Sequence, residues 1–202
     1  MPKLRIVVRS TFAVLLIGLS LKAVAEEKRL SGHWVSAWST AVHTPLPFPG
    51  LPPSPVYENQ TIRMIVRPTI GSDRMRIRLS NAFGTTALAI GGVHIALTKQ
   101  DAAIIPESDR ALTFGGRSAV SIPPGAPMLS DPVDLKISAF SEISVSIYLP
   151  QKTSTSTMHF WAQHPTYISE PGDFTAKPDV PNAKTNSSWY WLSDVEVWAD
   201  ES

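Results

Sequence analysis

The sequence predicts an all-β fold, a jelly-roll-like antiparallel β-sandwich of about eight to ten strands. Short segments in which apolar and polar residues alternate follow one another along the chain. No stretch of about 12 residues shows a helical period behind a capping residue. Proline, at 18 of 202 residues, and glycine mark turns between the segments. Strands and helices do not alternate in the way that indicates a parallel sheet.

The first 25 residues have the pattern of a secretory signal peptide. Three basic residues, the last of them Arg9, precede an apolar run at 11–21 that ends near the small residues at 23–25. The run is short of the roughly 20 residues that a transmembrane helix needs. We therefore expect a mature β-domain of residues 26–202 that is secreted or periplasmic and has no stable membrane span.

Charge and cysteine content exclude several classes of function. Lys plus Arg is 18 and Asp plus Glu is 17, so the basic excess of a nucleic-acid-binding domain is absent. The chain has no cysteine, which excludes disulfides, thiolate metal sites, iron–sulfur clusters and cysteine nucleophiles. Without disulfides, the stability of an exported domain must come from burial.

Two alternating segments, 60–67 and 74–80, predict a β-hairpin with its turn at 70–73. One face of the pair is apolar: Ile62, Met64, Val66, Met75, Ile77 and Leu79. The positions predicted to point outward carry arginines: Arg63, Arg67, Arg74, Arg76 and Arg78.

Further β-rich segments are predicted at 33–39, 87–97, 119–122, 133–137, 142–149, 158–168 and 189–198. Two stretches are predicted loops. Residues 43–57 contain six prolines, each of which removes a donor from a strand ladder. This stretch could be a polyproline II ligand, but a stiff surface loop is favoured because no basic residue accompanies the prolines. Residues 171–188 are polar and rich in turn formers.

The sequence contains none of the common motifs of serine hydrolases. Gly-x-Ser-x-Gly, Gly-Asp-Ser and Asn-Asp are absent, and no histidine has an aspartate three residues before it. His159 and His164 lie five apart, on opposite faces of a regular strand and without a nearby carboxylate, which disfavours a metal site. Glycine pairs at 91–92 and 115–116 lack the lysine or helix of a phosphate loop. No catalytic residue, metal or cofactor is therefore assigned.

The six tryptophans allow two interpretations. Exposed and coplanar indole rings would form a stacking platform for sugars, whereas large residues on one strand face usually pack into a core. By parity, Trp34 and Trp38 share one face, Trp189 and Trp191 share another, and Trp198 lies opposite them. Packing is the favoured interpretation.

An ordered series of segments resembles the N-terminal region of secreted bacterial SGNH (GDSL-type) hydrolases: 33–38, 59–67, 76–84, 112–117, 130–133 and 191–195. The best pieces read His-Trp-Val-Ser-Ala-Trp at 33–38 and Arg-Ile-Arg-Leu-Ser-Asn-Ala-Phe-Gly at 76–84. The resemblance implies that the α/β/α hydrolase domain follows such a β-rich region. The Gly-Asp-Ser nucleophile, the oxyanion donors and the Asp-x-x-His pair would then lie beyond Ser202. The resemblance suggests acetyl or aryl esters as substrates, including those on plant polysaccharide.

Three functions follow as hypotheses. The chain is an accessory or substrate-side β-domain of an exported SGNH-type esterase, truncated before its catalytic domain and inactive alone; or it is a free-standing carbohydrate-binding module; or it is an enzyme with an unrecognised site. The expected partners are a catalytic SGNH domain and a polysaccharide or acylated sugar. Candidate ligand or domain contacts are Asn81, His159, Trp161, Trp191 and Trp198. Together with Leu192 and Val195, the last two are predicted to meet the catalytic domain and to drive self-association without it.

Overall fold

The computed structural model describes residues 32–46, 50 and 53–200, so the predicted signal peptide lies outside the described residues. The chain divides into two compact units. One comprises residues 35–197 and carries the sheets. The other comprises the two chain ends, of which residues 32–34 and 198–200 are described. None of the helical structure in the described ranges is long and apolar enough to cross a membrane.

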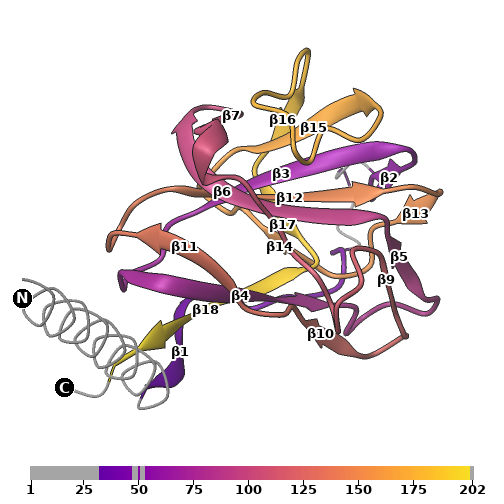
Figure 1. Ribbon diagram of the computed structural model, residues 1–202. Coiled ribbons are helices and arrows are strands. Elements are labelled where there is room, and N and C mark those ends of the chain that lie inside the picture. The colour runs from indigo at the N-terminus through magenta and orange to yellow at the C-terminus, as the bar shows by residue number, and fades with distance from the viewer. Residues whose placement is uncertain (1–31, 47–49, 51–52, 201–202) are drawn as a thin grey trace, which may run out of the picture. The chain divides into compact units, whose positions relative to one another are not determined.

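Two antiparallel sheets make up most of the 35–197 unit (Figure 1). The first is ordered β1 (His33–Ser39), β18 (Leu192–Ala199), β4 (Ser72–Ser80) and β10 (Pro127–Leu129), with β11 (Val133–Ile137) also paired to β4. The second is ordered β16 (Lys184–Asn186), β15 (Thr166–Pro171), β3 (Gln60–Val66), β12 (Ile143–Leu149), β6 (Gly92–Gln100) and β7 (Ala103–Ile104), with β8 (Arg110–Ala111) paired to β6.

Three short strand pairs and one 3-10 turn complete the described elements. The pairs are β2 (Val56–Tyr57) with β13 (Thr153–Ser154), β5 (Leu88–Ile90) with β9 (Val120–Ile122), and β14 (Met158–Phe160) with β17 (Ser188–Tyr190). The turn is η1 (Pro106–Ser108). The all-β antiparallel sandwich is confirmed. The described strands outnumber the eight to ten expected because many of them are only two or three residues long.

The predicted hairpin between 60–67 and 74–80 is wrong. β3 pairs with β12 and β15, whereas β4 pairs with β18, β10 and β11, so the two strands belong to different sheets. The connection between them is held by the Thr69 N–H, which donates to the Ala37 carbonyl at 2.8 Å. The apolar faces were predicted correctly, since Ile62 and Ile77 are both buried in one core. Two sheets that face a shared core show the same alternation as a hairpin.

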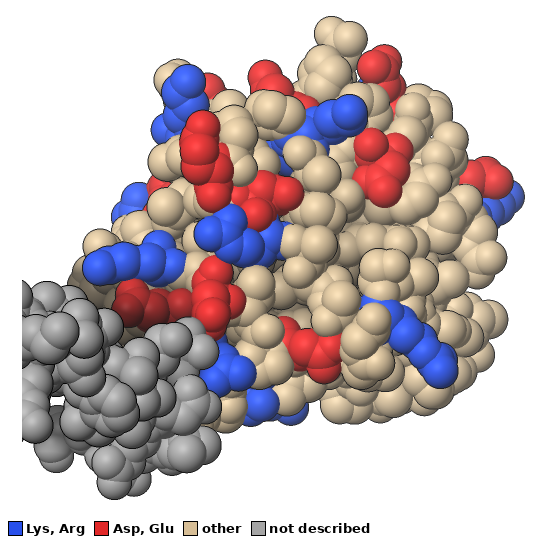
Figure 2. All heavy atoms as spheres, viewed as in Figure 1, with Lys and Arg blue, Asp and Glu red and all other residues tan. Residues whose placement is uncertain are grey.

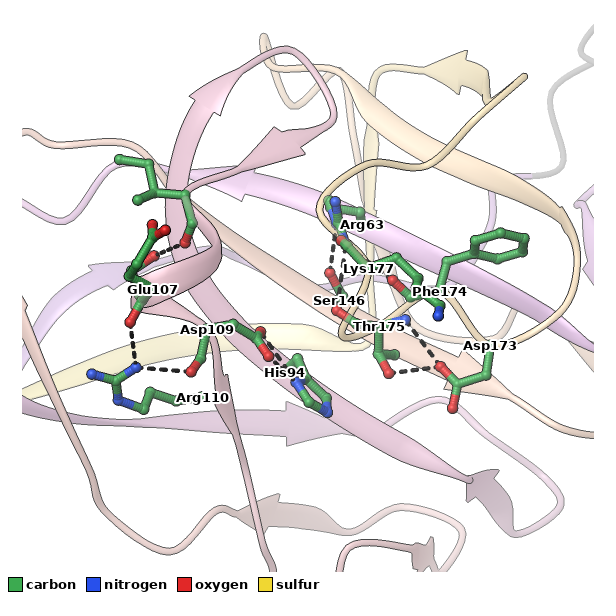
Figure 3. Close-up of polar contacts among 12 residues, drawn as sticks. Arg63, His94, Glu107, Asp109, Arg110, Ser146, Asp173, Phe174, Thr175 and Lys177 are labelled. Atoms are coloured by element: carbon green, nitrogen blue, oxygen red, sulfur yellow. Dashed lines mark hydrogen bonds and ion pairs between the residues drawn. The ribbon is translucent and has the colours of Figure 1, made fainter.

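Arg63, predicted to point outward, is fully buried. Its guanidinium donates to Ser146 Oγ at 2.8 Å, to the Ala102 carbonyl at 2.5 Å and to three carbonyls of the segment 174–177 at 2.8–3.3 Å (Figure 3). Burial lowers the pKa of Arg63 to about 10, and nearby acidic groups oppose this shift, so the side chain stays charged near neutral pH. The segment 173–183, predicted as a plain loop, therefore covers the second face of the β3 sheet.

The predicted strands 158–168 and 189–198 are each interrupted. The first divides into β14 and β15, with left-handed backbone at Trp161 (φ 56°) and Gln163 (φ 59°) between them. The second divides into β17 and β18 at Trp191 (φ 56°). Nothing in the sequence marks these positions, because left-handed backbone usually selects glycine or asparagine. The parity argument for the tryptophans assumed one regular strand and therefore does not apply across this break.

Glu196 on β18 joins two of the predicted outward arginines. Its carboxylate accepts a bond from Arg76 Nε at 2.7 Å and contacts Arg78 Nη2, and its side chain is only 8% exposed. Burial raises the pKa of Glu196, but the hydrogen bonds and charges of Arg78 and Arg76 outweigh this, so the pKa is lowered overall. The stability that this cluster contributes therefore depends on pH in the acidic range.

Protonation of Glu196 is expected to destabilise the fold. A carboxyl whose folded pKa lies below its unfolded value contributes stability above the unfolded pKa, and this stability is lost as pH falls through the folded one. Neighbouring Asp194 acts in the opposite sense, since burial raises its pKa. Urea unfolding between pH 6 and 3 should therefore show a loss of stability below about pH 4.5 that is weaker in Glu196→Gln. An equal slope in both proteins would refute this role.

Candidate functional site

A polar cleft of about 560 Å³ opens where β4 ends and β5 begins, next to the β13 segment. Hydroxyl and amide side chains dominate its lining, which consists of Thr44, Pro45, Asn81, Phe83, Thr85, Thr86, Ala87, Leu88 and residues 151–156. Lys152 is the only charged residue among the described lining residues. The volume is in the range of small-molecule sites.

Asn81, a predicted contact residue, lines this cleft but is buried and engaged within the fold. Its Nδ2 group donates to the carbonyls of Thr86, Ile122 and Pro123 at 2.9–3.2 Å. Its Oδ1 accepts a bond from Ser156 Oγ at 3.3 Å. Asn81 therefore ties together the loops that form the walls of the cleft, and it acts on a ligand only through their positions.

Gly84→Ala is expected to disrupt this arrangement. A Cβ atom at Gly84 would lie 1.8 Å from Asn81 Oδ1, so the Asn81 amide would have to move and release its carbonyl partners. We expect a loss of about 1–3 kcal/mol in the free energy of unfolding. The matched control is Gly92→Ala, whose Cβ would meet no atom closer than 3.9 Å. Similar melting temperatures for the two variants would contradict the role of Asn81.

An apolar groove of about 350 Å³ shares one lining residue, Pro45, with the polar cleft. Its described lining comprises His43, Pro45, Leu46, Pro53, Ser54, Pro55, Met158, Phe160, Asn186, Ser188 and Tyr190. Several polar groups in it already have partners: the Phe160 N–H donates to His43 Nε2 at 3.1 Å, and Asn186 Nδ2 donates to Tyr190 Oη at 2.8 Å. This groove therefore offers mainly apolar contact.

Trp161 is the most exposed large apolar residue among those described, at 71%. Its ring lies 4.9 Å from that of Phe160, which lines the apolar groove. His159, another predicted contact residue, is half-buried and stacks on Trp189 with ring centroids 5.6 Å apart. The Ala41 carbonyl accepts a hydrogen bond from His159 Nδ1 at 3.0 Å. The structure thus brings two predicted residues, His159 and Trp161, to the region of the groove, and only Trp161 is open to a partner.

Two other predicted contacts, Trp191 and Trp198, do not join them. Trp191 is fully buried, as are Leu192 and Val195, so these three residues cannot form the exposed docking surface that was predicted. In the unit of the chain ends, the Trp198 ring packs edge-on against Trp34, with centroids 5.3 Å apart. The packing interpretation is correct for Trp189 and Trp191, because both rings are buried.

His94 and Asp109 form a hydrogen-bonded pair that sequence reasoning missed, with His94 Nδ1 at 2.9 Å from Asp109 Oδ2 (Figure 3). A histidine oriented by a carboxylate is the base half of a serine-hydrolase triad. No hydroxyl group in the described ranges is hydrogen-bonded to His94. The pair joins β6 to the residue that precedes β8. The two residues are fifteen apart in the sequence, which matches no known catalytic motif.

Histidine and carboxylate side chains do not cluster in the part of the chain that the structure describes. No three His, Asp or Glu side chains among the described residues are grouped to hold an ion. Figure 2 shows basic and acidic side chains interspersed over the face drawn, rather than a basic patch.

Comparison with known proteins assigns no family. No protein-family model matches the chain, and no curated protein is significantly similar to it. The resemblance to SGNH hydrolases therefore rests on the sequence segments alone.

Proposed function

We propose that the chain is an accessory, substrate-side β-domain of an exported SGNH-type ester hydrolase, and that a catalytic domain supplies the nucleophile. The ordered series of SGNH-like segments supports this family. The presence of a polar cleft and an apolar groove that share Pro45 in their linings is the structural observation that carries the substrate-side role. An ester of a polar alcohol with an apolar acid presents both kinds of surface to a binding protein.

A free-standing carbohydrate-binding module is the second candidate. The exposure of Trp161 and Phe83 favours it, since sugar rings stack on accessible aromatic faces. The burial of Trp189 and Trp191 removes the broad tryptophan platform that this function would use. The two candidates differ in whether the domain acts with a catalytic partner.

The test begins with the DNA downstream of codon 202, read in all frames for Gly-Asp-Ser and Asp-x-x-His. A segment that carries both motifs is expressed as a separate polypeptide. We expect the present chain alone to hydrolyse p-nitrophenyl acetate no faster than buffer, to bind the catalytic segment, and to raise its turnover on an acetylated polysaccharide. Trp161→Ala should weaken this binding if the exposed indole contacts the catalytic segment.

Two results would overturn the proposal. One is turnover by the chain alone that a serine-reactive phosphonate abolishes, which would place a nucleophile in this domain. The other is the absence of an encoded SGNH segment, or of any binding to it, which would favour the free-standing module.

A further inference from the structure

The polar cleft contains groups that are free to bind a ligand. No described residue is hydrogen-bonded to the side-chain amide of Gln151 or to Lys152 Nζ, and both side chains are exposed. The Thr85 hydroxyl on the facing segment is likewise exposed and has no described partner. In the apolar groove, by contrast, the amide of Asn186 and the Nε2 atom of His43 are already engaged. Polar recognition is thus concentrated in the cleft.

Phe83 supplies an aromatic surface in the same cleft. It lines the cavity and is 46% exposed. Its backbone is fixed, because the Phe83 N–H donates at 3.1 Å to Thr157 Oγ1 and Thr157 is fully buried. The neighbouring Ala82 N–H donates to Ser80 Oγ at 3.3 Å. An exposed aromatic residue on an anchored turn loses little entropy when a ligand binds to it.

We propose that the polar cleft binds a saccharide chain, with one sugar ring against Phe83 and its hydroxyl groups bonded to Gln151, Lys152 and Thr85. Sugars combine an apolar C–H face with a rim of hydroxyls, and this matches one aromatic ring surrounded by amide, hydroxyl and ammonium groups. The single charge in the described lining disfavours polyanions, and the hydroxyl-rich walls disfavour lipid chains. The inference rests on the proposed substrate-side function and gives it a substrate class.

The experiment is affinity electrophoresis of the purified full chain in gels that contain xylan, O-acetylated xylan, glucomannan or dextran. We expect retardation by at least one polysaccharide. Phe83→Ala should raise the dissociation constant about tenfold, because one stacked ring is lost. Gln151→Ala should raise the dissociation constant several-fold. The fold of each variant is checked by thermal unfolding.

Phe140→Ala is the matched control. Phe140 is 64% exposed but lies beyond β11, whose last residue pairs with Ser72 at the start of β4, whereas the cleft is at the other end of that strand. Its binding should equal that of the unmodified chain. The inference is overturned if no polysaccharide retards the chain, if folded Phe83→Ala binds as tightly as the parent, or if Trp161→Ala alone abolishes binding.

The outcomes separate this inference from the proposed function. Saccharide binding that depends on Phe83, combined with the absence of an encoded SGNH segment or of any binding to it, supports the cleft and rejects the accessory role. Stimulation of an SGNH segment by a chain that binds no saccharide supports the accessory role and rejects the cleft.

Discussion

Replacing Arg63 by methionine is expected to lower the free energy of unfolding by about 3–5 kcal/mol. Methionine occupies part of the same buried space but donates no hydrogen bond. The carbonyls of Ala102 and Lys177 and their neighbours would then stay buried without donors. Such orphaned groups each cost about 1–3 kcal/mol, whereas the lost burial of the charge returns part of that energy. Guanidinium unfolding followed by tryptophan fluorescence measures the difference.

Two variants sharpen this measurement. Arg63→Lys keeps the charge but reaches fewer of the acceptors, so its stability should fall between those of the parent and Arg63→Met. Arg67→Met, four residues along the same chain, removes an arginine that is 51% exposed and pairs with Glu142 at 2.8 Å. It should cost under about 1 kcal/mol. If Arg63→Met and Arg67→Met unfold at the same denaturant concentration, Arg63 does not anchor the segment 174–177.

The second large effect is expected for Trp191→Ala, at about 3–5 kcal/mol of lost stability. The indole is fully buried and belongs to the main core, and its backbone N–H and carbonyl join Thr157 and Ser80 at 3.0 and 2.7 Å. Truncation would leave a large cavity in the main core. Thermal unfolding and far-ultraviolet circular dichroism report the loss.

Trp161→Ala isolates the effect of burial. Trp161 and Trp191 have the same residue type and the same φ of 56°, but Trp161 is 71% exposed. Since both substitutions leave a non-glycine residue in left-handed backbone, the local strain changes equally. Trp161→Ala should alter stability by less than about 0.5 kcal/mol. Comparable destabilisation by both would show that backbone conformation, rather than packing, determines the cost.

Alternation along the chain was enough to predict which strand faces are apolar. Ile62 and Met64 on β3, and Met75 and Ile77 on β4, all lie in the core. Alternation carries no information about which strand is the neighbour, so the β3–β4 hairpin was predicted where a crossing between sheets occurs. The burial of Arg63 could not be predicted either, because it depends on the segment 174–177 that covers it. That segment has no hydrophobic period from which its position could be predicted.

The candidate site was less predictable than the core. Its walls are turns and strands of two or three residues, and these come together only through long-range contacts such as Asn81 with Ile122. Phe83 belongs to the SGNH-like segment 76–84, but that resemblance gave it no binding role, and Gln151 belongs to no motif. The closeness of the two residues depends on where β4 and β12 end. Trp161 was selected as an aromatic residue, but its exposure follows from the left-handed backbone after β14, for which tryptophan is no signal.

The long-range pairing of β4 also bears on aggregation during synthesis. Arg76 meets Glu196 across a separation of 120 residues, so one edge of β4 has no neighbour until residues 192–199 exist. An open strand edge is a template for pairing with a second chain. Arg74, Arg76 and Arg78 alternate along this edge, and like charges placed opposite one another destabilise such a pair. Before Arg76 and Arg78 bind Glu196, we therefore expect the three arginines to disfavour self-association of the unfinished chain.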